Sequence, residues 1–269
     1  YYPRPAKERN LDLLRPRPGF AFYEGDLRDA DLLGRIMAEH RPTAVVHLGA
    51  LAGVRPSVQA PDRYMDVNVT GTARLLSAAQ AAGVSRFVLA SSSSVYGGDN
   101  EVPFSEDQPT TSPLSPYAAS KIAAEACCHA FHHLYSLPVV ALRFFTVYGP
   151  RQRPDLAIHK FTHKMLAGEP IQLFGDGSTS RDYTFIADIV RGIIAALDSD
   201  VDWSVVNLGG HRPVTLNELV AALERALGVE AIIERLPMQP GDMVRTCADV
   251  RKAKAVLGWE AHVTLDEGL

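Results

Sequence analysis

The chain has 269 residues, of which 46% are hydrophobic and 22% charged, and its formal net charge is −4 at pH 7. This composition is typical of a globular protein with ample length for a core, and it gives no electrostatic reason to expect nucleic acid or an anionic membrane as a partner. No apolar run approaches the roughly 18 residues that span a bilayer, and the start, Tyr1-Tyr2-Pro3-Arg4-Pro5, does not resemble a signal peptide, so a cytoplasmic location is expected.

The first half of the chain alternates short apolar runs with amphipathic stretches. Residues 1–19, rich in Pro and Arg, are expected to form a loop with a short helix near 8–14. The apolar runs predict strands at 20–23, 44–48, 87–90 and 139–143, and the helical periodicity predicts helices at 30–40, 64–82 and 117–135, with a loop at 50–61. Apolar strands that alternate with helices are typical of a parallel sheet covered on both faces, so an α/β fold with a doubly wound parallel sheet is predicted.

Beyond residue 146 the pattern changes, because Gly and Pro become frequent. One helix at 159–167 and a strand at 171–174 are expected there, followed by a helix at 188–197 and a strand at 205–208 that return to the sheet. Thr215-Leu-Asn-Glu218 is a capping box that predicts a helix to residue 227. We therefore expect a sheet domain at 1–146, to which 184–210 returns, and a smaller interleaved C-terminal lobe formed by 147–183 and 211–269.

Tyr117 and Lys121 stand one helical turn apart, behind a helix start at Ser115-Pro116. A free phenol has a pKa of about 10, so a tyrosine acts as a base near neutral pH only where a fixed cation favours its phenolate. Lys121 is placed to be that cation. The pair taken alone is a weak signal, because most such pairs lie on a solvated helix surface, and its context has to decide between the two.

Polar residues follow the predicted strands, which is where ligands bind in a doubly wound sheet. Asp26, Gly49 and Ala50, the serines at 91–94, and Thr146 all occupy such places. Each has a structural alternative: a helix cap for Asp26, a tight turn for Gly49 and a polar turn for the serines. Their convergence at one edge of the sheet predicts a ligand site.

Neither the cysteines nor the histidines predict a metal site. The three cysteines have no CxxC spacing and are expected to be reduced thiols. His129, His132 and His133 share one helix face, but the Ala-rich run at 123–130 suits close packing of that helix against another one, so no metal is expected.

Seven motifs occur in the order found in extended short-chain dehydrogenases that act on nucleotide sugars, and from residue 20 to its end the chain resembles an NAD-dependent epimerase/dehydratase. They are Asp26-Leu27, His47-Leu-Gly-Ala50, Asn68-Val-Thr-Gly-Thr72, Ser91-Ser-Ser-Ser-Val-Tyr-Gly97, Tyr117-x-x-x-Lys121, Arg143-Phe-Phe-Thr-Val-Tyr-Gly-Pro150 and Gly175-Asp-Gly-Ser-Thr-Ser-Arg-Asp-Tyr183. The resemblance implies a Rossmann-like sheet, a dimer and a UDP-sugar substrate. The dimer would be a homodimer formed through the helices at 64–82 and 117–135.

The resemblance also implies NAD as the cofactor. The residues that would contact it are Asp26, Leu27, Leu48, Gly49, Ala50, Asn68, Tyr117, Lys121 and Phe144. The GxGxxG-type loop and first strand-helix unit that would receive the pyrophosphate are absent from the chain, and the last helix of the family is missing. We expect a trimmed enzyme rather than a fragment unable to hold NAD, because every downstream motif is intact.

By the same resemblance Tyr117, Lys121 and Ser92 are the catalytic residues. Tyr117 would take the proton of the sugar's 4-hydroxyl while C4 gives hydride to NAD⁺, and Ser92 would hydrogen-bond that hydroxyl. Hydride return to the opposite face after the 4-keto sugar turns over would invert C4. The family's 4,6-dehydratases carry Asp-Glu after the catalytic Ser/Thr, where this chain has Ser93 and Ser94, so dehydration is disfavoured.

Serine hydroxyls can instead hydrogen-bond a substrate carboxylate, and Thr146 and Arg153 could complete such a site. This pattern resembles UDP-glucuronate 4-epimerases, which convert UDP-glucuronate to UDP-galacturonate. The chain departs from them at Arg151-Gln152, where Trp-Gly is usual, so a UDP-glucose or UDP-N-acetylglucosamine 4-epimerase remains open. A solvated loop arginine is an equal alternative for Arg153.

At the nucleotide end, the resemblance places Arg181 on the diphosphate, Phe174 near the uracil and Asp242 on the ribose hydroxyls. Plain core packing is the alternative for Phe174. Two further readings stay open for the whole protein. One is a non-catalytic NAD(H)- or nucleotide-binding protein of the same fold, and the other is a decarboxylase, because a 4-keto uronic acid readily loses CO₂.

Overall fold

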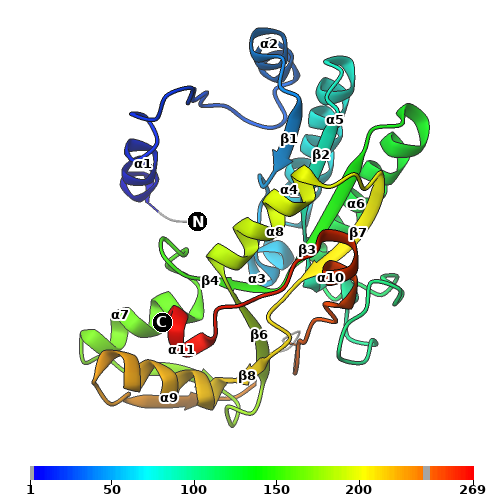
Figure 1. Ribbon diagram of the computed structural model, residues 1–269. Helices are drawn as coiled ribbons and strands as arrows, with labels where there is room; N and C mark the ends of the chain where they lie inside the picture. Colours follow the sequence, from blue (N-terminus) through cyan, green and yellow to red (C-terminus); the bar gives the residue numbers. More distant parts are fainter. Residues whose placement is uncertain (1–2, 239–242) are drawn as a thin grey trace.

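The computed structural model describes residues 3–238 and 243–269 and is built around a four-stranded parallel sheet (Figure 1). Its strands lie in the order β1 (Ala44–His47), β2 (Arg86–Ser92), β3 (Val139–Phe144) and β7 (Trp203–Leu208). The central strands β2 and β3 are buried almost throughout, which is why their sequences are apolar without alternation. The predicted α/β class with a parallel sheet is confirmed, and β7 returns to the sheet beside β3 as expected.

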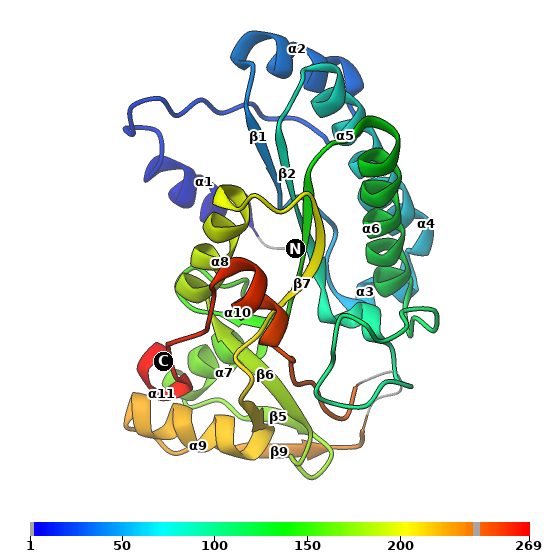
Figure 2. The same ribbon diagram turned by 45° about the vertical axis from the view of Figure 1, so that its right-hand side comes forward.

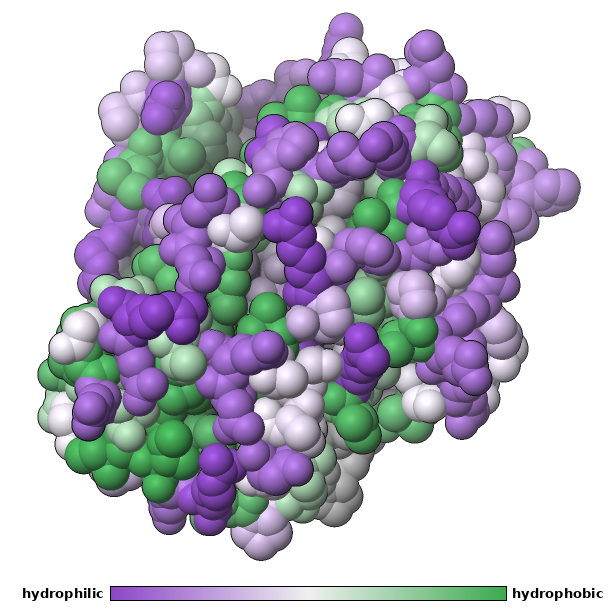
Figure 3. Space-filling model, turned by 60° about the horizontal axis from the view of Figure 1, so that its bottom comes forward, coloured by the Kyte–Doolittle hydropathy of each residue, from purple (hydrophilic) through white to green (hydrophobic). Residues whose placement is uncertain are grey.

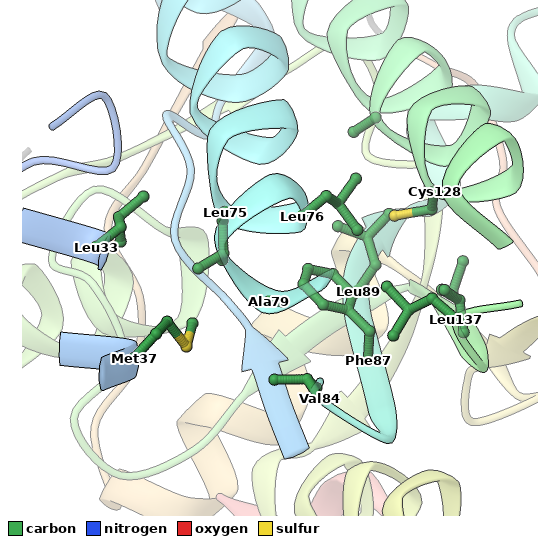
Figure 4. Close-up of a cluster of buried hydrophobic side chains, with 13 residues drawn as sticks. Leu33, Met37, Leu75, Leu76, Ala79, Val84, Phe87, Leu89, Cys128 and Leu137 are labelled. Carbon is green, nitrogen blue, oxygen red and sulfur yellow. The ribbon is translucent and has the colours of Figure 1, made fainter. Parts of the chain in front are cut away.

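Helices cover both faces of this sheet (Figure 2). On one face, α5 (Gly71–Ala81) and α6 (Pro116–Tyr135) pack on the strands, and α2 (Ala30–His40) packs on α5. Figure 4 shows the resulting core, in which Leu76, Phe87, Leu89 and Cys128 meet. On the other face, α8 (Ile186–Asp198) and α10 (Arg251–Leu257) form a second cluster with β3 and β7. The predicted helix at 117–135 and its cap at Ser115 are present, with Ser115 Oγ accepting from the N–H of Ala118 at 3.1 Å.

The single helix expected at 64–82 is divided into three parts. A short helix α4 (Pro61–Met65) leads into a π-helical turn, η1 (Asp66–Thr70), which continues into α5. The loop expected at 50–61 also contains a helix, α3 (Val54–Gln59). The periodicity of apolar residues could not reveal the π-helical turn, because such a turn adds one residue without interrupting the helix.

The strand expected at 20–23 is wrong. Residues 19–26 have no regular structure, and Phe22 is 52% exposed. A strand requires a hydrogen-bonded neighbouring strand, and no described strand pairs with this segment. It instead runs between α1 (Arg4–Asp12), which stands apart from the sheet, and α2 (Figure 1).

The C-terminal part forms a smaller layer beyond the carboxyl ends of the strands (Figure 2). Its strands are β4 (Thr146–Tyr148), β6 (Ser180–Phe185) and β8 (Pro213–Thr215) in one sheet, and β5 (Ile171–Phe174) and β9 (Ile233–Leu236) in another. The helices α7 (Ala157–Leu166), α9 (Leu216–Leu227) and α11 (Leu265–Gly268) cover them, and the capping box that opens α9 is present. On the face turned forward in Figure 3, hydrophilic and hydrophobic residues are interspersed.

The lobe boundaries stay a prediction, and α10 packs against β7 and α8 although its residues fall in the range expected for the lobe. Within 3–238 and 243–269, no helix is both long and apolar enough to cross a membrane.

Candidate active site

The candidate site lies at the carboxyl ends of the strands, where the polar residues singled out in the sequence come together. Ser92 ends β2 and Phe144 ends β3, and the two residues are partners in the parallel register. β1 ends at His47, and residues 48–53 follow it without regular structure. After Ser92 the chain turns into a short 3-10 helix, η2 (Ser93–Tyr96), which places Ser93 and Ser94 at the same edge.

Lys121 points from α6 into the sheet. Its side chain is 6% exposed, and Nζ donates a hydrogen bond to the carbonyl oxygen of Ala90 at 2.7 Å. Burial lowers the pKa of this lysine to about 8, against a smaller opposing effect of the nearby Glu125 carboxylate. The alternative of a solvated surface pair is therefore excluded for the lysine, whose ammonium lies two residues from Ser92 along β2.

Tyr117 stands one turn earlier, in the first turn of α6, and is half-buried. Its ring meets the ring of Tyr64 edge to face, with centroids 6.2 Å apart. Tyr64 in turn donates a hydrogen bond from its hydroxyl to the carbonyl oxygen of Ala52 at 2.7 Å. Tyr117 is thereby linked through one aromatic contact to the segment that follows β1.

Ser92 is largely buried, and its hydroxyl is engaged with the next turn. Its Oγ accepts from the N–H of Ser94 and donates to Ser94 Oγ, both at 3.2 Å. Both hydrogen bonds are long and therefore weak. A ligand that replaced one of them would cost little free energy.

A buried ionic network beneath this site was missed by the sequence reasoning. Glu125, one turn after Lys121, accepts from Arg143 Nε at 3.0 Å and Nη2 at 2.8 Å, and Ser91 Oγ also donates to it. Arg143 and Ser91 are paired in the register of β3 and β2. The available signal was an arginine inside an apolar strand, since such a charge is buried only when it is paired.

The edge of the sheet predicted to bind a dinucleotide contains side chains that are held by hydrogen bonds within the protein and others that are exposed. Asn68 is buried in η1 and bonds both backbone groups of Leu51, accepting from its N–H at 2.7 Å and donating to its carbonyl at 2.9 Å. It also donates to Ser120 Oγ of α6 at 2.9 Å. The π-helical turn thus ties the segment after β1 to the helix that carries Tyr117.

Leu27 packs against two glycines at this edge. A Cβ placed on Gly49 would lie 2.8 Å from Leu27 Cδ1, and one on Gly71 would lie 3.1 Å from Leu27 Cβ. Asp26 is exposed and ion-paired with Arg28 at 2.7 Å, and the hydrogen bonds from Arg28 hold the pKa of that carboxyl well below its usual range. Leu48 is 56% exposed, and Ala50 is partly exposed.

A cavity of about 220 Å³ opens in the C-terminal lobe. Three of the predicted substrate residues, Thr146, Phe174 and Arg181, line it. The other lining residues, to which the sequence assigned no binding role, are Gln152, Leu156, Ala157, Ile158, Thr179, Tyr183, Leu216 and Met238. The guanidinium of Arg55, from α3, lies 5.2 Å from the centroid of the Phe174 ring. Phe174 is therefore more than a core residue, because its ring faces both the cavity and a cation.

The remaining predicted substrate residues differ in their placement. Arg153 does not line this cavity, and its guanidinium pairs with Asp155 at 3.0 and 3.1 Å. Gln152 braces the cavity wall: its amide donates to the Val147 carbonyl at 2.9 Å and accepts from the N–H of His159 at 3.2 Å. Asp242 lies outside the described residues.

Two of the three histidines of α6, His129 and His132, make ordinary structural contacts, and His133 is exposed. His132 Nδ1 lies 3.0 Å from the carbonyl oxygen of Leu137, and the rings of His129 and His132 contact Trp203. Within the described part of the chain, no group of three or more His, Cys, Asp or Glu residues is arranged to hold a metal ion. The three cysteines are free thiols.

Known proteins resemble the chain over nearly all of its length. A family model described as GDP-mannose 4,6 dehydratase matches residues 6–269. The UDP-glucuronate 4-epimerase of Thermodesulfobacterium geofontis is 43% identical over 260 residues, which are 96% of this chain and 80% of that protein.

Solved structures agree. The structure of UDP-glucuronic acid 4-epimerase from Bacillus cereus, in complex with UDP-glucuronic acid and NAD, matches with a TM-score of 0.92 at 36% identity, over 99% of this chain and 84% of that chain. DesIV, a dTDP-glucose 4,6-dehydratase from Streptomyces venezuelae with NAD and TYD bound, matches with a TM-score of 0.91 at 32% identity, over 97% and 80% of the two chains.

Proposed function

The chain belongs to the NAD-dependent epimerase/dehydratase family, and we propose that it is a 4-epimerase that interconverts UDP-glucuronate and UDP-galacturonate. The observation that carries the proposal is the inward-facing Lys121 ammonium, placed one turn from Tyr117 and at the end of the strand that delivers Ser92. A lysine buried there serves no packing purpose that an apolar residue would not serve better, because burial disfavours its charge.

NAD fits the edge of the sheet at residues 26–27, 48–50 and 68. Leu27 packs where side chains on Gly49 and Gly71 would lie, which brings residues 26–27 close to the segment after β1. An aspartate and a lysine supply an acceptor and a donor for the ends of a dinucleotide. Lys121 spends one of its three N–H groups on Ala90, which leaves donors for a ribose diol. When bound, NAD⁺ supplies the hydride acceptor for C4 of the sugar. Phe144, at the end of β3, is the remaining residue proposed to contact it.

The proton chemistry belongs to the chain's own residues. Tyr117 removes the proton of the 4-hydroxyl as a phenolate and later returns it, and the Lys121 ammonium favours that phenolate. Ser92 donates a hydrogen bond to the oxygen at C4, and this bond replaces the long hydrogen bond from Ser92 Oγ to Ser94 Oγ. Inversion at C4 requires the oxidised sugar to rotate, so that hydride returns to its opposite face. This rotation needs open space, such as the cavity lined by Thr146.

The choice of UDP-glucuronate rests on side chains at the sugar end and on the named relatives. Ser93 and Ser94 follow Ser92 where a dehydratase would need carboxylic acids, and hydroxyls cannot perform the acid-base steps of dehydration. Hydroxyls and Thr146 can instead hydrogen-bond a carboxylate at C6. At the nucleotide end, Arg181 and Phe174 line the cavity and are proposed to hold the diphosphate and the uracil.

A UDP-hexose substrate is the second candidate, and one observation favours it. Arg153 is bidentate to Asp155, so its guanidinium is already occupied by a carboxylate and is less available to a uronic acid. A neutral sugar such as UDP-glucose or UDP-N-acetylglucosamine would not require that arginine.

A homodimer is also proposed. The helices α5 and α6 pack together on one face of the sheet, and Leu134 and Tyr135 at the end of α6 are largely exposed. Light scattering behind size exclusion measures the state directly, and a monomer mass would contradict it.

Product analysis tests the function. Purified protein with bound NAD, verified by absorbance, is incubated separately with UDP-glucuronate, UDP-glucose and UDP-N-acetylglucosamine, and the sugars are identified by NMR. UDP-galacturonate supports the proposal, and UDP-galactose or UDP-N-acetylgalactosamine alone supports the second candidate. A pentose product identifies a decarboxylase. Binding without turnover, unchanged by Tyr117→Phe, identifies a non-catalytic protein.

A further inference from the structure

The buried network beneath the candidate site joins three elements through one carboxylate. Glu125 lies on α6, is 8% exposed and accepts hydrogen bonds from Ser91 on β2 and from Arg143 on β3. Burying a carboxylate so deeply is unfavourable unless it is paired and fully hydrogen-bonded, as it is here. A leucine at this place would pack without that requirement, so the charge calls for an explanation.

The position of Glu125 relates it directly to the proposed chemistry. Lys121 and Glu125 are one turn apart, and they contact consecutive residues of β2, Ala90 and Ser91, immediately before Ser92. The helix is thus attached to the strand at two successive points. Arg143, paired in register with Ser91, extends the attachment to β3. These contacts fix the position of α6 along the direction of β2, and therefore the position of Tyr117 relative to Ser92.

We propose that Glu125 is a positioning residue for the epimerase reaction, which aligns Tyr117 with Ser92 and keeps Lys121 in its ammonium form. This inference rests on the proposed function. It goes beyond that function, because it gives a role to a buried side chain whose hydrogen-bond partners are Ser91 and Arg143 of the two strands.

The charges around Lys121 support the second half of the proposal. Glu125 and Cys128 on its own helix and His47 on β1 interact with it electrostatically, and Tyr117 stands one turn before it. Burial keeps the His47 imidazole neutral at pH 7, since it lowers the pKa to about 4, and burial raises the pKa of the Cys128 thiol, which stays uncharged. Glu125 is therefore the group that supplies negative charge beside the ammonium.

Arg143 stabilises the carboxylate from the other side and ties it to the rest of the fold. Its guanidinium carbon lies 4.8 Å from the centroid of the Tyr96 ring, and the Tyr96 hydroxyl donates to Asn207 Oδ1 on β7 at 2.6 Å. The network therefore spans β2, β3 and β7 at the same end of the sheet. Such a framework holds a carboxylate in one orientation, which a positioning role requires.

The variant Glu125→Gln tests the inference, because it keeps the size of the side chain and an acceptor for Ser91 but removes the charge. We expect kcat to fall about 10- to 100-fold while KM for the UDP-sugar stays within about threefold, since ground-state binding is not touched. The alkaline limb of the kcat profile should move to lower pH, because Lys121 loses the carboxylate that raises its pKa. Glu125→Asp retains the charge and should restore the wild-type position of that limb even if kcat stays reduced.

A matched control separates positioning from loss of stability. Asp188 is another buried carboxylate paired with an arginine, the more exposed Arg191, but it lies on α8 across the sheet. Asp188→Asn should lower the melting temperature as Glu125→Gln does and leave the alkaline limb in place. If both variants move the limb equally, or if folded Glu125→Gln moves neither kcat nor the limb, the inference is wrong.

A readout that needs no turnover keeps this test distinct from the proposed function. The ¹³Cε resonance of Lys121, assigned by its absence in Lys121→Met, reports the titration of the ammonium directly. A lower midpoint in Glu125→Gln supports the electrostatic role even if no UDP-sugar is turned over. An unchanged midpoint overturns that role even if the wild-type protein proves to be an epimerase.

Discussion

The ammonium of Lys121 lies 2.7 Å from the carbonyl oxygen of Ala90, two residues before the serine that ends β2. This contact fixes the charge at the mouth of the sheet, on the side where Tyr117 begins the same helix. A lysine held by a backbone carbonyl cannot swing out to solvent without leaving that acceptor unpaired. The contact holds Lys121 one turn from Tyr117, and the predictions below depend on the acid-base role proposed for these two residues.

Removing the phenol should abolish catalysis and leave binding intact. Tyr117→Phe keeps the edge-to-face contact with Tyr64 but has no proton to exchange. We expect kcat to fall by about 10² to 10⁴, the usual contribution of a general acid-base group. The dissociation constant of UDP, measured by calorimetry, should change less than threefold relative to wild type, because a substitution of this kind usually changes the free energy by no more than about 0.5 kcal/mol. Retained turnover would assign the proton transfer to another group.

Replacing the lysine should make the protein inactive but more stable. Burial lowers the pKa of Lys121 from 10.5 to about 8, so the unfolded state binds more protons between these values. The buried lysine therefore destabilises the fold below pH 8 and ceases to do so as the pH rises toward 10.5. Lys121→Met should gain up to about 3 kcal/mol at pH 7 before the loss of the Ala90 hydrogen bond is subtracted.

Urea unfolding of wild type and Lys121→Met at pH 7 and at pH 10.5 measures this difference. The advantage of the variant should shrink at the higher pH. If Lys121→Met is less stable than wild type by the same free energy of unfolding at pH 7 and at pH 10.5, then burial of the Lys121 charge does not destabilise the fold. In the wild-type enzyme, kcat should also decline above pH 8, as the ammonium that supports the phenolate is lost.

A single hydroxyl at the sugar end should discriminate between substrates. Thr146→Val removes the hydroxyl at nearly constant volume from the wall of the lobe's cavity. If Thr146 holds the carboxylate, KM for UDP-glucuronate should rise about 10- to 100-fold, the worth of a hydrogen bond to a charged group. The KM for UDP-glucose should stay nearly constant. Thr179→Val, in the same cavity wall, is the control and should affect both substrates alike.

The guanidinium of Arg181 should be irreplaceable by an amine. Arg181→Lys keeps the positive charge but loses the planar fork that matches phosphate oxygens. We expect the affinity for UDP, measured by calorimetry, to fall about tenfold or more. Arg225→Lys, on an exposed ion pair of α9, should leave UDP binding as in wild type. Equal affinity in both variants would remove Arg181 from the nucleotide site.

How far the sequence predicted this molecule can be judged from individual residues. The strands with continuous apolar runs were predicted correctly because a strand buried on both faces is made of apolar residues. The capping box was predicted correctly because its two hydrogen bonds require a residue such as Thr215 at the N-cap and one such as Glu218 three positions later. The edge segment at 20–23 was misjudged, since its apolar residues look like a strand whether or not a neighbour is present. Periodicity describes one segment, whereas pairing depends on another.

The site shows the same limit. Tyr117 and Lys121 were predicted together because they are close in sequence, and the resemblance supplied Ser92. Glu125 and Arg143 are 18 positions apart and meet only after the helix folds onto the sheet. Arg55 reaches Phe174 from a segment expected to be a loop, which no local pattern could foretell. Contacts between distant segments are what a single sequence does not contain.

The π-helical turn η1 makes the chain sensitive to length at one place. Asn68 bonds Leu51 and Ser120 at once because the widened turn rotates it toward both. Deleting one residue between 66 and 70 would let the helix continue regularly, turning the amide away by about 100° while α5 keeps its fit to the sheet. Alanine substitutions at the neighbouring positions would be tolerated where a one-residue gap would not. Homologues should therefore differ in the residues around Asn68 far more readily than in the number of residues in this turn.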